Sequence, residues 1–205
     1  MARYGRALAL VDENWAHETA RYPGQVHCHE GCAACCFGTF AFSLADALLV
    51  QAAFASLDAR KQADCQLRAR VFAVTLGEPG LHRVDTTGEA ELDRLLEPVG
   101  NLPCPFLNAD QTCVIYSSRP LVCRLHGIPI KSADNQVLDP GCELNFVGMD
   151  VRALQGFELD ISAFDEAEAE ETALIGDILG SDPATQILLP AAILPPWYPA
   201  VPRDG

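Results

Sequence analysis

Apolar residues recur at helical spacing in the first part of the chain. Between Arg6 and Arg21, the apolar residues Leu8, Val11 and Trp15 return every three or four positions. That interval places them on one face of a helix, so the sequence predicts an N-terminal helix ahead of the first cysteines.

Two further helices are predicted between residues 43 and 76. The first opens with Ser43, and Asp46 three positions later gives it the pattern of a capping box. Ser56 is expected to cap the second helix. The positions expected to face inward on this second helix are Cys65, Val71 and Phe72.

The pattern becomes less regular after residue 76. Residues 77–87 contain two glycines, a proline and two threonines, which predicts a loop, and a short helix is predicted from Glu89 to Leu96. Between Cys104 and Cys142, the segments "TCVIY" and "GIPIK" predict short strands, with "ADNQ" as a hairpin turn. A last amphipathic helix is predicted from Ser162 to Leu179, and the proline-rich stretch after it predicts an extended wrap or a loose end.

These elements predict a mainly α fold with a small irregular or β segment, an α+β arrangement in which helices pack around a cysteine-rich site. With 205 residues, 49% of them hydrophobic, the chain is long enough for one domain with its own core. We expect residues 1–205 to form that single domain. Within it, residues 25–145 would form a cysteine-rich metal-binding core, residues 146–180 an acidic helical extension, and residues 181–205 a proline-rich tail.

The charge balance narrows the range of partners. Fourteen Lys and Arg face twenty-eight Asp and Glu, which gives a formal charge of -14 and a pI near 4.6. Such a charge repels phosphate backbones and anionic lipid, so we expect neither nucleic acid nor a membrane as a partner. Ten carboxylates and the single cation Arg152 fall between Glu143 and Asp177, which is typical of a solvated helix face.

The cysteine content bears on the compartment and the chemistry. No run approaches the roughly 18 apolar residues of a membrane span, and the N-terminus "MARYGRALALVDENW" has too short an apolar stretch for a secretory signal. We therefore expect a cytoplasmic protein, in a reducing compartment where stable disulfides are rare. Nine cysteines in that setting favour metal ligation or thiol chemistry over a disulfide framework.

Eight of the nine cysteines fall into two groups, the first of them in "HCHEGCAACC". Cys65, within a predicted helix, is expected to be a buried small hydrophobe. The candidate metal ligands are Cys28, Cys32, Cys35 and Cys36, followed by Cys104, Cys113, Cys123 and Cys142. Thiolates held close together repel one another strongly, so a cation must lie among them if they converge.

The adjacent pair Cys35 and Cys36 constrains the kind of site. Neighbouring side chains point to opposite faces of an extended segment and diverge by about 100° on a helix, so one mononuclear tetrahedral site does not readily take both. Two nearby sites or a polynuclear cluster explain the pair better. Eight thiols would fill two four-cysteine sites, or four of them would hold one 4Fe–4S cluster and leave the rest for a second metal or for structure.

The spacing of these cysteines resembles that of a known family. The patterns C-x3-C-x2-C-C from Cys28 to Cys36, "CPFL" at 104–107 and C-x-I-Y-x-x-R-P-x-x-C-R from Cys113 to Arg124 resemble the CxxCxxCC cysteine-cluster family, which includes the YkgJ-type proteins. The resemblance covers roughly residues 25–145 and implies a zinc- or iron-chelating domain. The family's eight cysteines map onto the eight candidates above, and Cys65 falls outside the pattern.

Several residues near the cysteines are expected to support the site. Arg119 and Arg124 bring positive charge beside the thiolates, where they would lower the thiol pKa and donate hydrogen bonds to sulfur. His126 follows Cys123 at a spacing that zinc ligands use, but eight cysteines already supply enough ligands, so we expect it beside the site. His27 and His29, which flank Cys28, have the same interpretation.

Catalytic alternatives fit the sequence less well. Cys28, Cys32 and Cys35 reproduce the C-x3-C-x2-C spacing of radical SAM enzymes, but Ala34 stands where that motif carries an aromatic residue, and the βα repeats of a barrel are missing. All-cysteine ligation argues against hydrolytic zinc catalysis, because such sites are usually closed and structural. No catalytic residue is identified, and the sequence leaves an enzymatic role undecided while favouring a non-enzymatic one.

The resulting hypothesis is a metal-binding protein that holds iron, as a 4Fe–4S cluster, or zinc through the eight cysteines. The adjacent cysteine pair favours iron. One alternative is a structural zinc module that mediates a protein–protein interaction. Another is a redox or radical enzyme, or its accessory protein, that uses an iron–sulfur cluster. The expected partner is the metal ion, and a protein partner is left open.

Overall fold

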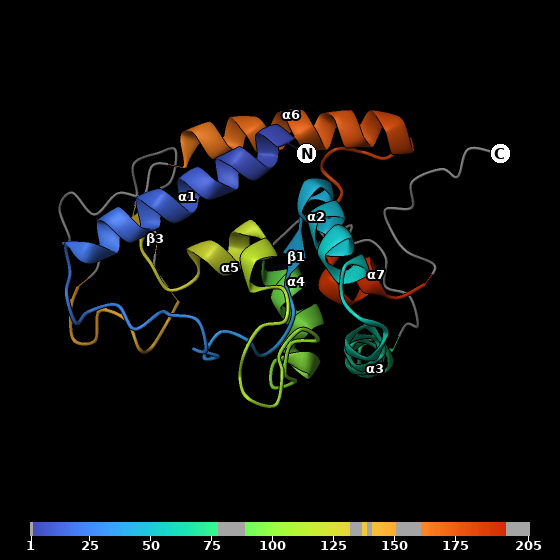
Figure 1. Ribbon diagram of the computed structural model, residues 1–205, viewed down its shortest axis with the longest axis horizontal. Coiled ribbons are helices and arrows are strands. Elements are labelled where there is room, and N and C mark those ends of the chain that lie inside the picture. The colour runs from blue at the N-terminus through green and yellow to red at the C-terminus, as the bar shows by residue number, and fades with distance from the viewer. Residues whose placement is uncertain (1, 78–88, 132–136, 139–140, 151–160, 196–205) are drawn as a thin grey trace.

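The computed structural model of the chain describes residues 2–77, 89–131, 137–138, 141–150 and 161–195 (Figure 1). The elements in these residues are, in chain order, α1 (Ala2–Ala20), β1 (Ala41–Phe42), α2 (Leu44–Ala55), α3 (Ala59–Thr75), α4 (Glu89–Leu96), the 3-10 helices η1 (Glu97–Val99) and η2 (Tyr116–Ser118), α5 (Leu121–Leu125), β2 (Ile130–Lys131), β3 (Val137–Leu138), α6 (Ser162–Leu179), β4 (Ile187–Leu188) and α7 (Leu189–Ile193). The fold is mainly α with a small β component, which confirms the predicted fold class. None of the helices within the described ranges is long and apolar enough to cross a membrane.

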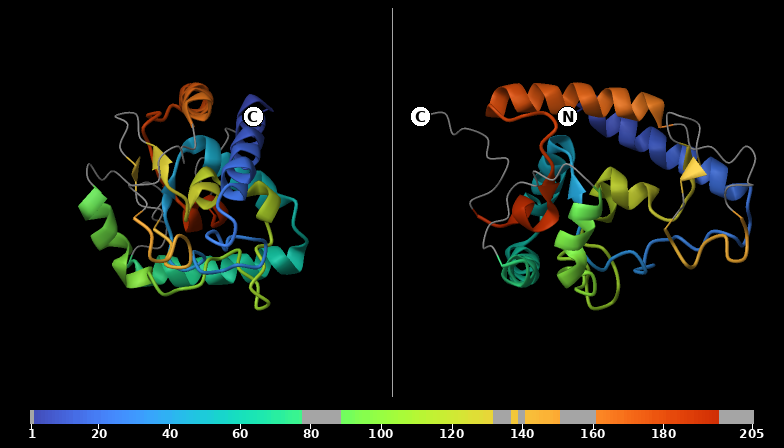
Figure 2. Two further views of the ribbon diagram at one scale, coloured as in Figure 1. Left: turned by 90° about the vertical axis from the view of Figure 1, so that its left-hand side faces the viewer. Right: turned by 180° about the vertical axis from the view of Figure 1, so that it is seen from behind.

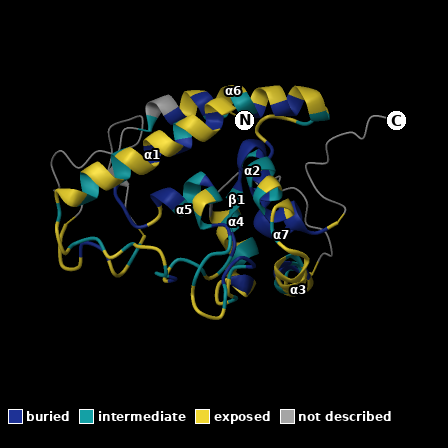
Figure 3. Cartoon of the chain, in the orientation of Figure 1, coloured by how far each residue is buried: buried dark blue, intermediate teal, exposed yellow. Residues whose placement is uncertain are grey.

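Helices α1 and α6 lie side by side and run in opposite directions along one side of the molecule (Figures 1 and 2). Tyr4 of α1 packs against Phe164 of α6, with their ring centroids 5.4 Å apart. Leu8 and Val11 of α1 are buried as the sequence predicts, and Trp15 is half-buried. The outward faces of both helices are exposed, so the pair forms an outer layer in which α1 packs on α5 and α6 packs on α2 (Figure 3).

A second layer, made of α2, α3 and α7, holds many of the deeply buried apolar side chains (Figure 3). Phe54 of α2 and Phe72 of α3 are at most 2% exposed. Strand β1 enters this layer directly after the first cysteine loop and pairs antiparallel with β4, with Ala41 opposite Leu188. The pairing therefore fixes the C-terminal end of that loop to the core.

The described part of the proline-rich C-terminal stretch belongs to the core. The sequence predicts an extended wrap or a loose end for residues 181–205, but Ile187 and Ile193 are fully buried. Pro190 lies in the first turn of α7, where a missing N–H costs no helical hydrogen bond. Proline in a sequence suggests the end of a regular element, but Pro190 lies at the start of a buried helix.

The turn between α2 and α3 is only partly predicted. Ser43 caps α2 as expected, because its hydroxyl accepts a hydrogen bond from the Asp46 N–H at 3.2 Å. Ser56, expected to cap α3, is instead the C-cap residue of α2. Asp58 caps α3 by accepting a hydrogen bond from the Lys61 N–H at 2.9 Å. Ser and Asp are about equally good N-caps, so propensity does not separate these two positions.

The inward face of α3 is also partly predicted. Cys65 and Phe72 are buried as expected, whereas Val71 is 47% exposed. Residues 71 and 72 are separated by about 100° around the helix, so the burial of one turns the other toward solvent.

The two predicted strands have different outcomes. "GIPIK" contains β2, which pairs antiparallel with β3. "TCVIY" forms no strand, because Cys113 makes only an isolated bridge to Leu107 and η2 begins at Tyr116. The predicted turn "ADNQ" and residues 78–87 of the predicted loop lie outside the described residues, while the helices α4 and α6 have the predicted bounds.

Asp46 links three helices at a buried junction. Its side chain is 2% exposed and accepts hydrogen bonds from the Tyr4 hydroxyl at 2.7 Å and from the Leu121 N–H at 3.0 Å. The second bond satisfies a backbone donor in the first turn of α5, the helix that carries Cys123. Burial raises the pKa of Asp46 to about 6, although the hydrogen bonds from Tyr4 and Leu121 oppose this shift.

We expect Asp46 to make the protein less stable as the pH rises through that pKa. The folded pKa lies above the ordinary 3.8, so the folded state binds more protons in this range. The stabilisation is complete below about pH 4 and is lost as the pH rises through about 6. Asp46→Asn cannot titrate, so the difference in unfolding free energy between variant and wild type should change by on the order of 2 kcal/mol over that window.

Urea unfolding at about pH 4 and pH 7 measures this difference. The exposed Asp64→Asn serves as the control and should differ from wild type by a small, constant amount. If the effect of Asp46→Asn on the free energy of unfolding did not change with pH, Asp46 would not be the source of this pH dependence.

Candidate metal centre

Backbone hydrogen bonds join the first cysteine loop to the second group of cysteines. The Cys104 N–H donates to the Cys36 carbonyl at 2.8 Å, and the Gly38 N–H donates to the Leu102 carbonyl at 2.8 Å. These bonds place Cys36 beside Cys104, although the two residues belong to different groups in the sequence.

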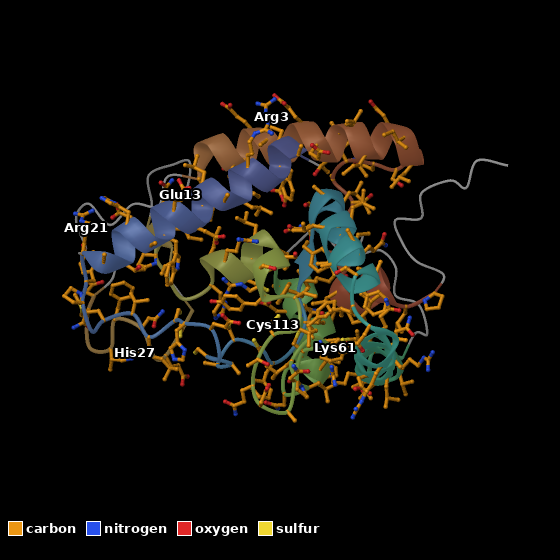
Figure 4. All side chains as sticks on the ribbon, viewed as in Figure 1. Arg3, Glu13, Arg21, His27, Lys61 and Cys113 are labelled. Carbon is orange, nitrogen blue, oxygen red and sulfur yellow. The ribbon has the colours of Figure 1, made fainter. Side chains whose placement is uncertain are left out.

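A tight turn and a short helix position the next two cysteines, Cys113 and Cys123, the first of which is labelled in Figure 4. Residues Leu107 and Cys113 form an isolated antiparallel bridge, and the Val114 N–H donates to the Phe106 carbonyl at 3.0 Å. Cys123 follows in α5, whose start is held against α2 by Asp46. The thiols of both groups are therefore carried by segments tied to the helical core.

Six of the cysteines line one small space, which we call the inner cavity. Its volume is about 60 Å³, and its other walls include Phe40, Phe106, Ile115 and Leu189. The six cysteines are Cys32, Cys35, Cys36, Cys104, Cys113 and Cys123. Both sequence groups thus contribute thiols to a single, largely apolar space.

A second space of about 250 Å³, the outer cavity, adjoins the inner one on the side of α1. Cys28 lines it together with three cysteines that border both cavities, namely Cys32, Cys35 and Cys123. The remaining lining residues are mostly polar or aromatic: Asp12, Trp15, His29, Tyr116, Arg119, Arg124 and His126. Helix α1, which precedes the cysteine motif, therefore forms part of this wall.

Cys142 approaches Cys28 across Gly127. A Cβ added to Gly127 would lie 3.0 Å from the Cys142 Cβ and 3.4 Å from the Cys28 Sγ. Beside them, the Asn145 Nδ2 donates to the Cys28 Sγ at 3.1 Å and to the Gly127 carbonyl at 2.6 Å, while its Oδ1 accepts from the His27 N–H at 2.8 Å. Because Asn145 is 5% exposed, these bonds fix the position of Cys28 in a buried setting.

The two predicted arginines have different environments. Arg119 borders both cavities, its guanidinium carbon lies 3.7 Å from the centroid of the Tyr116 ring, and its Nε donates to the Tyr116 carbonyl at 3.1 Å. Arg124 is buried and donates to the Arg119 carbonyl at 2.8 Å and to the Ser117 carbonyl at 3.0 Å, and it forms an ion pair with Asp12. Arg119 thus brings charge to the thiols, and Arg124 holds the segment that carries Arg119.

Several thiols of this arrangement have raised pKa values. Burial raises the pKa of Cys104 to about 12 and raises the pKa of Cys123 well above its ordinary value. The pKa of Cys35 is raised chiefly by its hydrogen bond with Cys36 and then by burial. Burial also raises the pKa of Cys28, against the hydrogen bond from Asn145. Ionising several of these thiols together requires a nearby cation.

The thiols border common cavities without yet forming a coordination shell. Among the residues that the structure describes, no group of three or more His, Cys, Asp or Glu side chains is arranged to hold a metal ion. Metal binding would require both deprotonation and a closer approach of the sulfurs.

Three further residues bear on the site: Cys65, His126 and Asn145. Cys65 lines neither cavity and is fully buried in α3, where the Arg68 Nη2 lies 3.7 Å from its sulfur. His126 lies at the wall of the outer cavity. Asn145 is a residue that the cysteine pattern does not single out, and its place three residues after Cys142 is the signal that points to it.

We expect Gly127→Ala to disturb the packing of Cys28, Cys142 and Asn145. Gly127 has a φ of +87°, and an added Cβ would lie 2.9 Å from the Asn145 Nδ2. Gly24, with a φ of +76°, has nothing within 4 Å of such a Cβ. The left-handed backbone should cost each alanine variant about 1 kcal/mol, and crowding should raise the loss at Gly127 to about 3 kcal/mol.

The free energy of unfolding in urea measures both losses. Equal losses in Gly127→Ala and Gly24→Ala would mean that the contact around Cys28 is not tightly packed.

Comparisons with known proteins place the cysteine segment in a family. Residues 27–143 match the family model "CxxCxxCC: Putative zinc- or iron-chelating domain". No curated protein and no solved structure matches the chain. The match spans more than half of the 205 residues and includes all eight cysteines at or beside the two cavities, whereas α1, α6 and α7 lie outside it. The chain therefore belongs to the CxxCxxCC family of zinc- or iron-chelating domains.

Proposed function

We propose that this protein binds metal through eight cysteines arranged as two neighbouring four-thiolate sites. The observation that carries the proposal is that seven of the eight cysteines line two adjoining cavities and the eighth, Cys142, lies beside Cys28. The proposed outer site consists of Cys28, Cys32, Cys35 and Cys142. The proposed inner site consists of Cys36, Cys104, Cys113 and Cys123.

The neighbours of Cys28 support the outer set. The charges that act on the Cys28 thiol are those of Cys142, Cys32 and Cys35, and they raise its pKa once ionised. Three of the four also border the outer cavity. The Asn145 side chain already donates a hydrogen bond to the Cys28 sulfur, as residues around metal thiolates commonly do.

Other contacts support the inner set. The Cys123 thiol is buried, and the charges of Cys104, Cys35 and Cys113 act on it, so Cys35 of the outer set also lies close to the inner one. Cys36 joins them through the backbone hydrogen bond from Cys104 and borders the inner cavity but not the outer one. Arg119 lies close enough to Cys113 and Cys123 to lower their pKa, which would offset part of the charge of an inner thiolate set.

This division separates the adjacent pair Cys35 and Cys36. Cys35 borders both cavities and Cys36 only the inner one, so neighbouring side chains would serve different sites. Such an assignment meets the geometric constraint that one tetrahedral ion does not readily accept two consecutive cysteines.

For the inner site we favour an iron–sulfur cluster over a single zinc ion. Zinc bonded to four sulfurs at about 2.3 Å leaves no free volume among them. The thiols of the inner cavity leave about 60 Å³ between them, so they would have to move less to hold a polynuclear cluster than to hold a single ion, and most of the other lining side chains are apolar. The outer set would then hold a further zinc or iron ion. When bound, the metal at either site would neutralise the charge of the thiolates, and an iron–sulfur cluster would also carry single electrons.

Metal and acid-labile sulfide analysis of anaerobically purified protein tests the metal assignment. We expect about four iron and four sulfide per chain from the inner site, with broad visible absorption, and additional metal from the outer one. About two zinc ions per chain without sulfide would overturn the cluster assignment and leave a two-site zinc module, which chelators should unfold.

Single substitutions test how the cysteines are divided. Cys104→Ser should lose the sulfide and most of the iron, whereas Cys28→Ser should keep the sulfide and lose only the additional metal. Cys65→Ala, which removes a buried thiol outside both sets, is the matched control and should keep both. Loss of all metal in both Cys28→Ser and Cys104→Ser, with Cys65→Ala unaffected, would indicate a single site in place of two.

A further inference from the structure

An open groove lies beside the cysteine cavities and carries a concentration of exposed apolar side chains. Its volume is about 590 Å³, and its lining includes Phe37, Leu144 and Val147, which are 50%, 45% and 70% exposed. Gly31, Cys32 and Gln111 border both this groove and the inner cavity. The groove is therefore the open side of the cysteine site, and apolar groups left in water there favour a partner that covers them.

One wall of the groove is held in place by its buried neighbours. Asn145 and Phe146 point inward and are 5% and 3% exposed, while Leu144 and Val147 on either side of them point outward. Phe146 has a φ of 51°, which few non-glycine residues adopt, and its N–H donates to the Gln25 carbonyl at 2.8 Å. The turn thus presents two apolar side chains to solvent from a fixed backbone.

The other walls are also fixed by backbone contacts. Phe37 forms an isolated bridge with Pro103, so its exposed ring stands on an anchored segment. Gln111 has a φ of 64°, and the Asp110 carboxylate accepts hydrogen bonds from the Thr112 N–H at 3.1 Å and from the Thr112 hydroxyl at 2.6 Å. A groove whose walls are already ordered loses less entropy when it binds a partner.

Apart from His27 and His29, the charged residues of the three chain segments that line the groove are all acidic. Segments 26–40, 107–114 and 141–150, which supply every lining residue, contain four carboxylates and no Lys or Arg. Three of these carboxylates adjoin lining residues in the sequence and are exposed: Glu30, Asp110 and Glu143. A second copy of the chain would bring the same carboxylates, and a total charge of -14, against this rim.

We propose that this groove binds a segment of another protein whose apolar side chains cover Phe37, Leu144 and Val147 and whose flanking Lys or Arg face the carboxylates. The inference goes beyond the metal assignment, because the groove needs neither site to be loaded. A partner bound there would contact Gly31 and Cys32 and would cover the entrance to the inner cavity.

Fluorescence anisotropy with labelled model peptides on the anaerobically purified full chain tests the proposal. The probe is a short peptide that alternates Leu with Lys. One reference peptide alternates Leu with Glu, and another alternates Ser with Lys. We expect the Leu–Lys peptide to bind at least about tenfold more tightly than either reference, because it alone satisfies both the apolar walls and the acidic rim.

Matched variants locate the binding. Val147→Ser and Phe37→Ser should each weaken Leu–Lys binding about fivefold or more. Leu174→Ser is the control, because Leu174 is 56% exposed on the acidic helix α6, away from the groove. Weakened binding in this variant would indicate that the peptide is held by the negative charge of the protein and not by the groove. Val147 is 70% exposed, so its substitution leaves the fold intact even if Phe37→Ser does not.

Three results would overturn the proposal: equal weakening by Val147→Ser and Leu174→Ser, equal binding of the Ser–Lys peptide, or self-association of the chain that Val147→Ser abolishes while no peptide binds. Metal content measured on the same preparations tests the metal assignment independently of peptide binding. Full metal content without peptide binding refutes the docking groove alone.

Discussion

The constraint on which this structure depends is that buried thiolates cannot lie together without a cation. Burial raises the pKa of Cys104 and of Cys123, so ionising these two thiols together is costly unless a cation lies beside them. A metal that replaces those protons would remove the repulsion and draw the sulfurs together. The scaffold therefore needs only to hold the thiols near one another, and metal binding would bring the sulfurs to bonding distance.

Two buried polar side chains outside the cysteine pattern help the scaffold to do this. Asp46 ties α2 to the start of α5 and so locates Cys123, while Asn145 ties Cys28 to Gly127. Both side chains are nearly fully buried, where removing one partner of a hydrogen bond leaves the other unsatisfied. Helices α1 and α7 lie outside the family match, yet α1 forms part of the outer cavity's wall and α7 contributes Leu189 to the inner one. The residues that surround the cysteines thus include some that lie outside the family match.

The features predictable from the sequence are those with local causes. Apolar periodicity locates α1, α2, α3, α4 and α6, and cysteine spacing identifies the family, because both depend on neighbours within a few positions. Some errors, such as the cap of α3, arise where two local choices are equally good, and others arise where long-range contacts decide. Ile187 is buried where β4 pairs with β1, and Ile193 is buried where α7 packs against α2 and α3, all of them distant in the sequence. The contact between Asn145 and Cys28 joins residues more than a hundred positions apart, so the spacing of the cysteines alone does not reveal it.

A single turn connects the outer cysteine set with the exposed groove. Cys142 approaches Cys28, Asn145 donates to the Cys28 sulfur, and the outward-facing Leu144 and Val147 flank the buried pair formed by Asn145 and Phe146. Leu144 lies two residues after Cys142, so one short segment carries a residue of the outer cysteine set and an apolar wall of the groove. The Phe146 N–H donates to the Gln25 carbonyl and the Asn145 side chain donates to the Gly127 carbonyl, and both bonds hold the backbone of this turn. The contacts that position Cys28 beside Cys142 are therefore also the contacts that order the apolar wall of the groove.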